Sequence, residues 1–213
     1  MISLLNSLLV IVLVLNLFAL GSSRLRAVIR AVALQRALLG LLPLVVHQHW
    51  SAEVIGMSLA TMLLKAIIIP TMLMRALREA QIKREVEPLI GLLPSMILGA
   101  AATGFAMVFA SGLPLTGVHT APLLVPASLA TVLVGFILLT TRVKAISQVI
   151  GYLVLENGIF LFGMLLLEAM PMVAEMGVLL DLFVGVFVIC IIVNHINRAF
   201  ASLDTRRLAE LKE

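Results

Sequence analysis

The chain of 213 residues contains a single cysteine, and few of its residues are charged. One cysteine cannot form an internal disulfide framework or a cysteine-rich metal or iron–sulfur site. Charged residues make up only 12% of the sequence, hydrophobic residues make up 62%, and the mean hydropathy is +1.19. An ordinary soluble domain has about 25% charged residues. The scarcity of charge excludes that class and indicates a membrane protein.

The apolar residues are grouped in runs of about 20, the length that a helix needs to cross a bilayer. Few residues are left between the runs for a soluble domain, a nucleotide-binding fold or a lid over a substrate. We therefore expect an all-α integral membrane protein with about seven transmembrane helices. The expected spans are roughly 2–21, 28–48, 53–74, 87–110, 120–140, 146–168 and 174–197, with Cys190 inside the last.

The basic residues lie in alternate connections between the expected spans, and the other connections have almost none. The net charge of +4 and the pI of about 9.8 therefore reflect membrane topology and not nucleic-acid binding. The positive-inside rule then places the N-terminus outside and the C-terminus in the cytoplasm. The basic residues are Arg24, Arg26 and Arg30; Arg75, Arg78, Lys83 and Arg84; Arg142 and Lys144; and Arg198, Arg206, Arg207 and Lys212.

The first and last parts of the chain resemble each other. The segment 22–28, Ser-Ser-Arg-Leu-Arg-Ala-Val, matches the segment 140–146, Thr-Thr-Arg-Val-Lys-Ala-Ile, and Gly40 and Gly158 fall in the same register. We interpret this as two three-helix units of the same polarity. The alternative is that topology alone requires both turns to be basic. The predicted parts are 1–75 (first unit), 76–118 (cytoplasmic turn and linker transmembrane helix), 119–200 (second unit) and 201–213 (cytoplasmic tail).

Three ionisable residues interrupt the expected spans. Lys65 lies in the middle of the run 54–70, and Glu156 and Asp181 lie in the last two spans. A charge at the bilayer centre costs about 2.5–3.5 kcal/mol on insertion scales, so such residues usually face protein or water. One interpretation is a polar path for protons. The other is that Lys65 pairs with Glu156 or Asp181 only to fix helix packing, or that Asp181 is solvated near the outer surface.

Helical spacing places Gln148, Tyr152 and Glu156 on one face of the sixth span, because they recur every four residues. Asp181 and His195 share a face of the seventh span. His195 is also close to the inner headgroups. Arg36, near the cytoplasmic end of the second span, is expected to extend to the headgroups and to have no functional role. The predicted proton or ion path comprises Glu156, Asp181, Lys65, Tyr152, Gln148 and His195.

The sixth span resembles the second helix of the NuoK-type small membrane subunit of complex I, through Ile150-Gly151 and the later Glu156-Asn157. The next helix of that family has an acidic residue four positions before a glycine, and 181–185 has this spacing. The length, the seven spans and the C-terminal NuoK-like unit resemble hydrogenase-4 component E (the HyfE type). This family belongs to group 4 membrane-bound nickel–iron hydrogenases and formate hydrogenlyases.

The family places its first glutamate two residues after the glycine. Leu153 takes that position here, and Glu156 lies three residues later, about one turn deeper on nearly the same face. The resemblance implies that Glu156 takes the proton-transferring role at a shifted depth. It also implies a location in the cytoplasmic (inner) membrane of a bacterium or archaeon.

The resemblance further implies a non-catalytic subunit that contributes to a proton or sodium path, coupled to electron transfer in other subunits. The nickel–iron (NiFe) centre and iron–sulfur clusters then belong to partner subunits, and this chain contacts hydrogenase subunits and antiporter-like membrane subunits. Two alternatives stay open: an independent secondary transporter of a small solute, and a structural spacer without an ion path. The prolines that could break helices do not pair between the two units, which disfavours the transporter.

Overall fold

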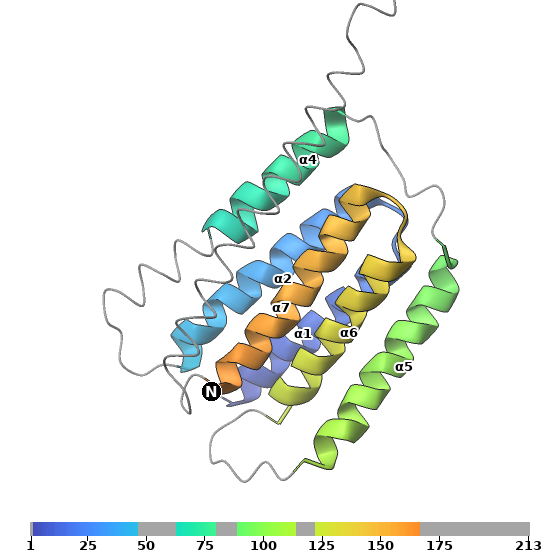
Figure 1. Cartoon of the computed structure of the whole chain (residues 1–213). Helices are drawn as coiled ribbons and strands as arrows, with labels where there is room; N and C mark the ends of the chain where they lie inside the picture. The colour runs from blue at the N-terminus through green and yellow to red at the C-terminus, as the bar shows by residue number, and fades with distance from the viewer. Residues whose placement is uncertain (1, 47–62, 80–88, 114–121, 167–213) are drawn as a thin grey trace, which may run out of the picture.

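The computed structural model describes residues 2–46, 63–79, 89–113 and 122–166, and these residues are almost entirely helical. The helices overlap six of the seven expected spans, the third of them only over 63–74, and the seventh, 174–197, lies outside the described residues. Figure 1 shows their arrangement. The elements are α1 (Ile2–Gly21), α2 (Leu25–Val46), the π-helix η1 (Leu63–Ile68), α4 (Ile69–Glu79), α5 (Leu92–Ser111), α6 (Leu124–Thr141) and α7 (Ala145–Leu166).

Two helical hairpins form the centre of the molecule. The α1–α2 hairpin lies against the α6–α7 hairpin, so that α1 contacts α6 and α2 contacts α7, with both turns at the same end (Figure 1). At that end, Arg142 Nη2 in the second turn donates a hydrogen bond to the Leu20 carbonyl at 2.8 Å. The outer helices cover this bundle: α5 packs on α6 and α1, and η1 and α4 pack on α2.

The α6–α7 contact is unusually close because glycines lie at the interface. A Cβ added at Gly158 would be 2.5 Å from the Val132 nitrogen, and one at Gly151 would be 2.6 Å from the Leu139 nitrogen. A Cβ at Gly135 would likewise meet the backbone of Leu155. Small residues that let two backbones approach are typical of helix contacts in membranes, where no hydrophobic force drives association. These glycines fix the position of α7, the helix of Glu156.

Hydroxyl groups within the apolar helices are bonded to the preceding turn of their own helix. Thr131 Oγ1 donates to the Ala127 carbonyl at 2.7 Å, and Ser128 Oγ donates to the Val125 carbonyl at 2.8 Å. This arrangement satisfies the hydroxyls where water is scarce. It explains how α6 remains regular although it contains several serines and threonines.

The expected third span contains an irregular segment. The run 53–74 was expected as one α-helix, but its described part is a π-helix at Leu63–Ile68 followed by α4, which continues to Glu79. Pro70 has no N–H to donate, and its ring crowds the preceding turn, so the regular i→i−4 pattern is broken there. The wider π-turn accommodates this change, and Lys65 lies within it.

Four helices of the described chain are long and apolar enough to cross a membrane: α1, α5, α6 and α7. They indicate a membrane protein. The helix α2 is equally long, at 22 residues, but contains three arginines. Large apolar side chains on α5 are exposed, as lipid contact requires; they include Leu93, Ile97, Phe105 and Val108.

Candidate functional site: a polar cluster between α2 and α7

A charged side chain crosses from α2 to α7 in the middle of both helices. Arg36 Nη1 donates a hydrogen bond to Asn157 Oδ1 at 3.0 Å. The guanidinium also lies over the ring of Phe160, 4.9 Å from its centroid, in a cation–π contact. Asn157 and Phe160 are three residues apart and thus share a face of α7. Only 5% of Arg36 and 2% of Asn157 are exposed, so the pair is internal.

The expectation that Arg36 extends to the headgroups is wrong. Its long side chain could have extended along α2 to the surface, but the carboxamide of Asn157 lies directly across the helix contact. A guanidinium is weakly hydrated and delocalised, so it tolerates burial better than an ammonium when it has hydrogen-bond and aromatic partners. Arg36 is therefore part of the interior and belongs to the candidate site.

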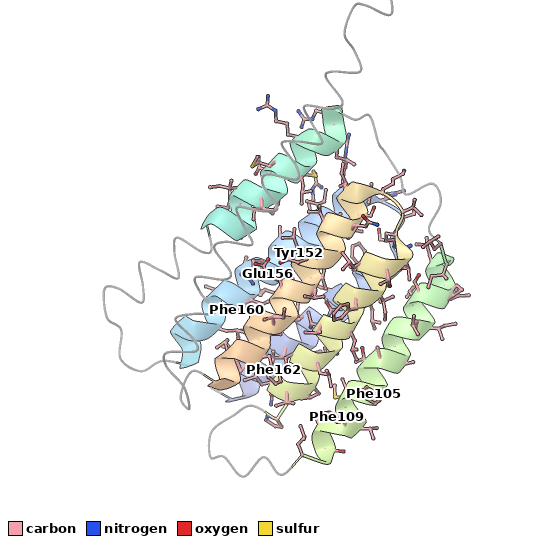
Figure 2. The ribbon with its side chains drawn as sticks, viewed as in Figure 1. Phe105, Phe109, Tyr152, Glu156, Phe160 and Phe162 are labelled. Atoms are coloured by element: carbon pink, nitrogen blue, oxygen red, sulfur yellow. The ribbon has the colours of Figure 1, made fainter. Side chains whose placement is uncertain are left out.

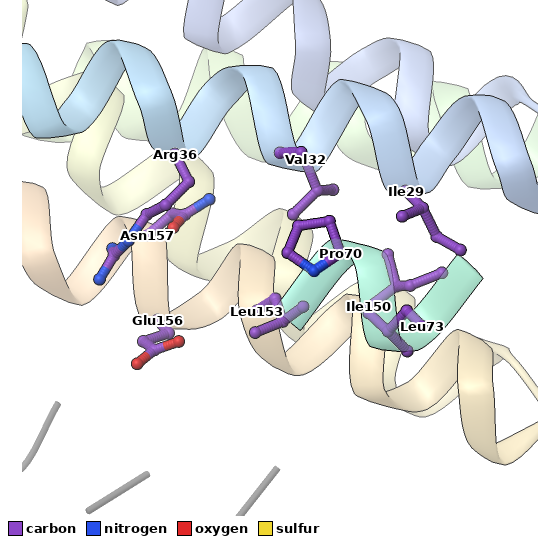
Figure 3. A pocket seen from close by; sticks show the side chains of 10 residues that line it. Ile29, Val32, Arg36, Pro70, Leu73, Ile150, Leu153, Glu156 and Asn157 are labelled. Carbon is purple, nitrogen blue, oxygen red and sulfur yellow. Dashed lines mark hydrogen bonds between the residues drawn. The ribbon is translucent and has the colours of Figure 1, made fainter. Parts of the chain in front are cut away.

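Glu156 lies beside this pair and lines the same cavity (Figure 3). Three helices form the cavity, whose volume of about 10 Å³ is about the space that one water molecule occupies. Glu156 is 6% exposed. The buried Nδ2 group of Asn157 has no hydrogen-bond partner among the described residues. The lining is Ile29, Val32, Ala33 and Arg36 of α2, Pro70 and Leu73 of α4, and Ile150, Leu153, Glu156 and Asn157 of α7.

A second polar cluster joins three helices one residue away along α2. Gln35 Nε2 donates to Asn16 Oδ1 at 3.0 Å, and Asn16 Nδ2 donates to Thr131 Oγ1 at 2.8 Å. All three side chains are at most 1% exposed. The network links α1, α2 and α6 and fixes their relative register. Because its members are neutral, it cannot itself store a proton at ordinary pH.

One sequence relative places the chain in a family. The chain is 34% identical over 194 residues to the protein named "Uncharacterized protein Rv0085" of Mycobacterium tuberculosis, and the alignment covers 89% of this chain and 87% of that protein. The chain belongs to the Rv0085 family. No family model matches it, and no solved structure matches it.

In this member of the Rv0085 family, the three predicted site residues of α7 lie along one helix but have different surroundings. Figure 2 labels two of them, Tyr152 and Glu156. Glu156 is buried at the cavity. Tyr152, one turn before it, is half-buried and packs against the core near the turns. Gln148 is exposed, and its Nε2 donates to the Arg142 carbonyl at 3.2 Å, at the start of the helix. These three residues, spaced four apart in the sequence, therefore lead from the turn end of the bundle towards the cavity.

Of the other predicted site residues, Lys65 lies within the described part of the chain by its backbone alone. The backbone of Lys65 lies in η1, which packs on α2, but its side chain lies outside the described part. Asp181 and His195 lie outside the described residues. Among the residues that the structure describes, no group of three or more His, Cys, Asp and Glu side chains could hold a metal ion.

Neither Arg36 as a site residue nor the network of Asn16, Gln35 and Thr131 was predicted from the sequence. Neutral amides in an apolar run are a weaker signal than charges because their burial costs less. Asn16 and Gln35 are nevertheless polar interruptions of apolar segments, and each could have been found by that criterion. Their pairing depends on which helices touch, and that information comes from the fold.

Proposed function

We propose that the chain is a non-catalytic membrane subunit of a complex I-like, membrane-bound hydrogenase, of the hydrogenase-4 component E type. It contributes part of a proton (or sodium) path through the cytoplasmic membrane of a bacterium or archaeon. Electron transfer takes place in partner subunits, which hold the NiFe centre and the iron–sulfur clusters. The remaining partners are antiporter-like membrane subunits.

The observation that supports an ion path is a carboxyl and a guanidinium on one small cavity inside an apolar bundle. Burial of ionisable groups in a membrane protein is costly, so they are retained where they pair or take part in transport. Glu156 can gain and lose a proton, Arg36 stays charged, and the cavity has room for about one water. A titrating group beside a fixed charge and a water site is a minimal proton-transfer unit.

The geometry of α7 also supports the resemblance to NuoK-type subunits. In that family the glutamate comes two residues after the glycine, where this chain has Leu153. Leu153 and Glu156 line the same cavity, so the shift by three residues retains a carboxyl at that place. Gly151 contacts the backbone of α6, which gives the glycine of the motif a packing role. The assignment to a hydrogenase complex rests on this resemblance.

The proposal includes seven spans, with the N-terminus outside and the C-terminus cytoplasmic, and two NuoK-like three-helix units joined by α5. The basic turns 22–26 and 142–144 then lie on the cytoplasmic side. Both turns are at the same end of the bundle, which agrees with this orientation. Asp181, Lys65 and His195 complete the proposed path together with Tyr152 and Gln148.

A structural spacer is the second candidate, because one observation favours it. The network of Gln35, Asn16 and Thr131 is internally satisfied and joins three helices, as a group that only fixes register would do. An independent transporter is less favoured. The cavity at Glu156 takes about one water, whereas pockets for small organic molecules are about 300–1,000 Å³.

Membership of the complex can be tested by purifying the tagged, full-length protein from membranes of its native host in a mild detergent. The proposal predicts that a large nickel–iron hydrogenase subunit and antiporter-like subunits co-purify with it. A matched sample from untagged cells gives the background. Recovery of the chain alone, with hydrogenase subunits present in the same membranes but not retained, would contradict the assignment.

A further inference from the structure

Arg36 is the described charged residue that shares a cavity with Glu156, and it has no role in the resemblance described above. It comes from α2, and Glu156 comes from α7 (Figure 3). Its position is fixed twice, by the hydrogen bond to Asn157 and by the Phe160 ring. A side chain held in this way keeps its charge at one place while the neighbouring carboxyl changes its protonation.

We propose that Arg36 is the positioning charge of this site: its guanidinium, fixed by Asn157 and Phe160, sets the pH at which Glu156 exchanges its proton. The proposal deepens the proposed function and rests on it, because it takes Glu156 as the group that exchanges protons. Arg36 itself does not transfer protons, since a guanidinium remains protonated in proteins. The hydrogen bond to Asn157 joins α2 to α7, and Asn157 directly follows Glu156 in the chain.

The physical reason is the balance between burial and an opposite charge. Removal from water favours the neutral form of a carboxyl, and a cation within about 4–6 Å favours the ionised form by about 1–3 pH units. In a bundle of apolar helices, water screens such a charge weakly. A fixed guanidinium therefore makes the ionised carboxylate accessible where burial alone would keep it neutral.

Among the described residues, few other groups lie around the cavity. On α4 the lining is Pro70 and Leu73, which are uncharged, and on α7 Tyr152 lies one turn from Glu156. Lys65 is five residues before Pro70, and its side chain is outside the described part. The unpartnered Asn157 Nδ2 is a donor at the cavity that a water molecule or the carboxylate can accept. Such a contact would connect the Arg36–Asn157 pair to Glu156.

The test is an infrared pH titration of the full-length protein, purified with the subunits that accompany it. The carbonyl stretch of protonated Glu156 is identified as the band that the Glu156→Gln variant lacks. We expect the band to disappear as the pH rises, and in Arg36→Met we expect its midpoint to move upward by about 1–3 pH units. Arg36→Lys should retain most of the wild-type midpoint, because the charge is kept.

Two controls separate this effect from general damage. Arg30→Met removes an exposed arginine from the same helix and should leave the midpoint unchanged. Asn16→Leu breaks the neighbouring neutral network, whose members do not line the cavity, and should lower stability without moving the midpoint. An unchanged midpoint in Arg36→Met, or a Glu156 band that does not titrate in the wild type, would overturn the proposal.

If Arg36→Met does not accumulate, the double variant Arg36→Met/Glu156→Gln provides a second test. Removing one member of a buried charge pair leaves the other uncompensated, and removing both does not. The double variant should therefore recover more folded protein than Arg36→Met; no recovery would refute the coupling. Wild-type proton pumping by Glu156→Gln would refute the proposed function instead, and the titration of Arg36→Met would still stand or fail separately.

Discussion

Arg36 and Asn16 are tolerated inside this bundle because each has specific contacts in the interior. Arg36 has an amide and an aromatic ring, and Asn16 has two hydrogen-bonded partners on other helices. The two polar clusters of the described chain differ in charge. The neutral network of Asn16, Gln35 and Thr131 stabilises the packing, whereas the cluster at Arg36 and Glu156 contains the group that can titrate.

The neutral network makes a prediction about stability. Gln35→Leu should leave the buried Asn16 Oδ1 without the Gln35 donor, which costs about 1–3 kcal/mol for a buried acceptor. Thermal unfolding in detergent, followed by circular dichroism, would show a lower midpoint than the wild type. Ser7→Ala removes an exposed hydroxyl that bonds its own helix and should have little effect. A melting temperature equal to that of the wild type in Gln35→Leu would rule out a stabilising network.

Close contacts between helices form at glycines, which have no side chain to hold the backbones apart. The glycines Gly135, Gly151 and Gly158 let α7 lie against the backbone of α6, and this contact fixes the rotation that points Asn157 towards α2. In contrast, Gly104 on the outer helix α5 has nothing within 4 Å of the place where a Cβ would be. The four glycines look alike in the sequence and differ only in their neighbours.

This difference can be measured with a matched pair of substitutions. Gly158→Ala introduces a Cβ at 2.5 Å from the Val132 nitrogen, and overpacking of this kind costs about 1–3 kcal/mol. Gly104→Ala adds the same methyl group where space is open and should be neutral or slightly stabilising, since alanine favours helix over glycine. Comparable unfolding midpoints for the two variants would mean that the close α6–α7 packing is not required.

The sequence predicted most of the helices but not their contacts. Runs of about 20 apolar residues have one stable form in a bilayer, so α1, α2, α5, α6 and α7 could be located from composition. The π-turn at Leu63–Ile68 was missed because the apolar run continues through it; Pro70 was the available signal. Glu156 was found because a carboxylate stands out in an apolar run. Arg36, which lines the same cavity, was not found. Its side chain could extend to the headgroups or turn inward, and only the fold shows that Asn157 lies opposite it on α7 and binds it in the interior.

Membrane orientation is a property of the whole molecule, and the basic turns predict it. The α1–α2 and α6–α7 turns lie at one end of the bundle, joined by the Arg142–Leu20 hydrogen bond, and both contain basic residues. We expect a reporter fused after Glu213 to be cytoplasmic and one inserted between Gly112 and Val118 to be on the opposite side. Reporters that indicate the same side would contradict the seven-span arrangement.

The central claim is that Glu156 moves a proton during turnover, and ion translocation by the assembled complex tests it most directly. Glu156→Gln keeps the shape of the side chain and removes its titration. Membrane vesicles with the variant complex, assembled to the wild-type level, should lose nearly all hydrogen-dependent proton (or sodium) uptake, and hydrogen turnover should fall less. Glu79→Gln, at the end of α4, is the matched control and should translocate normally. Wild-type translocation by a fully assembled Glu156→Gln complex would contradict the account and leave the subunit as a scaffold.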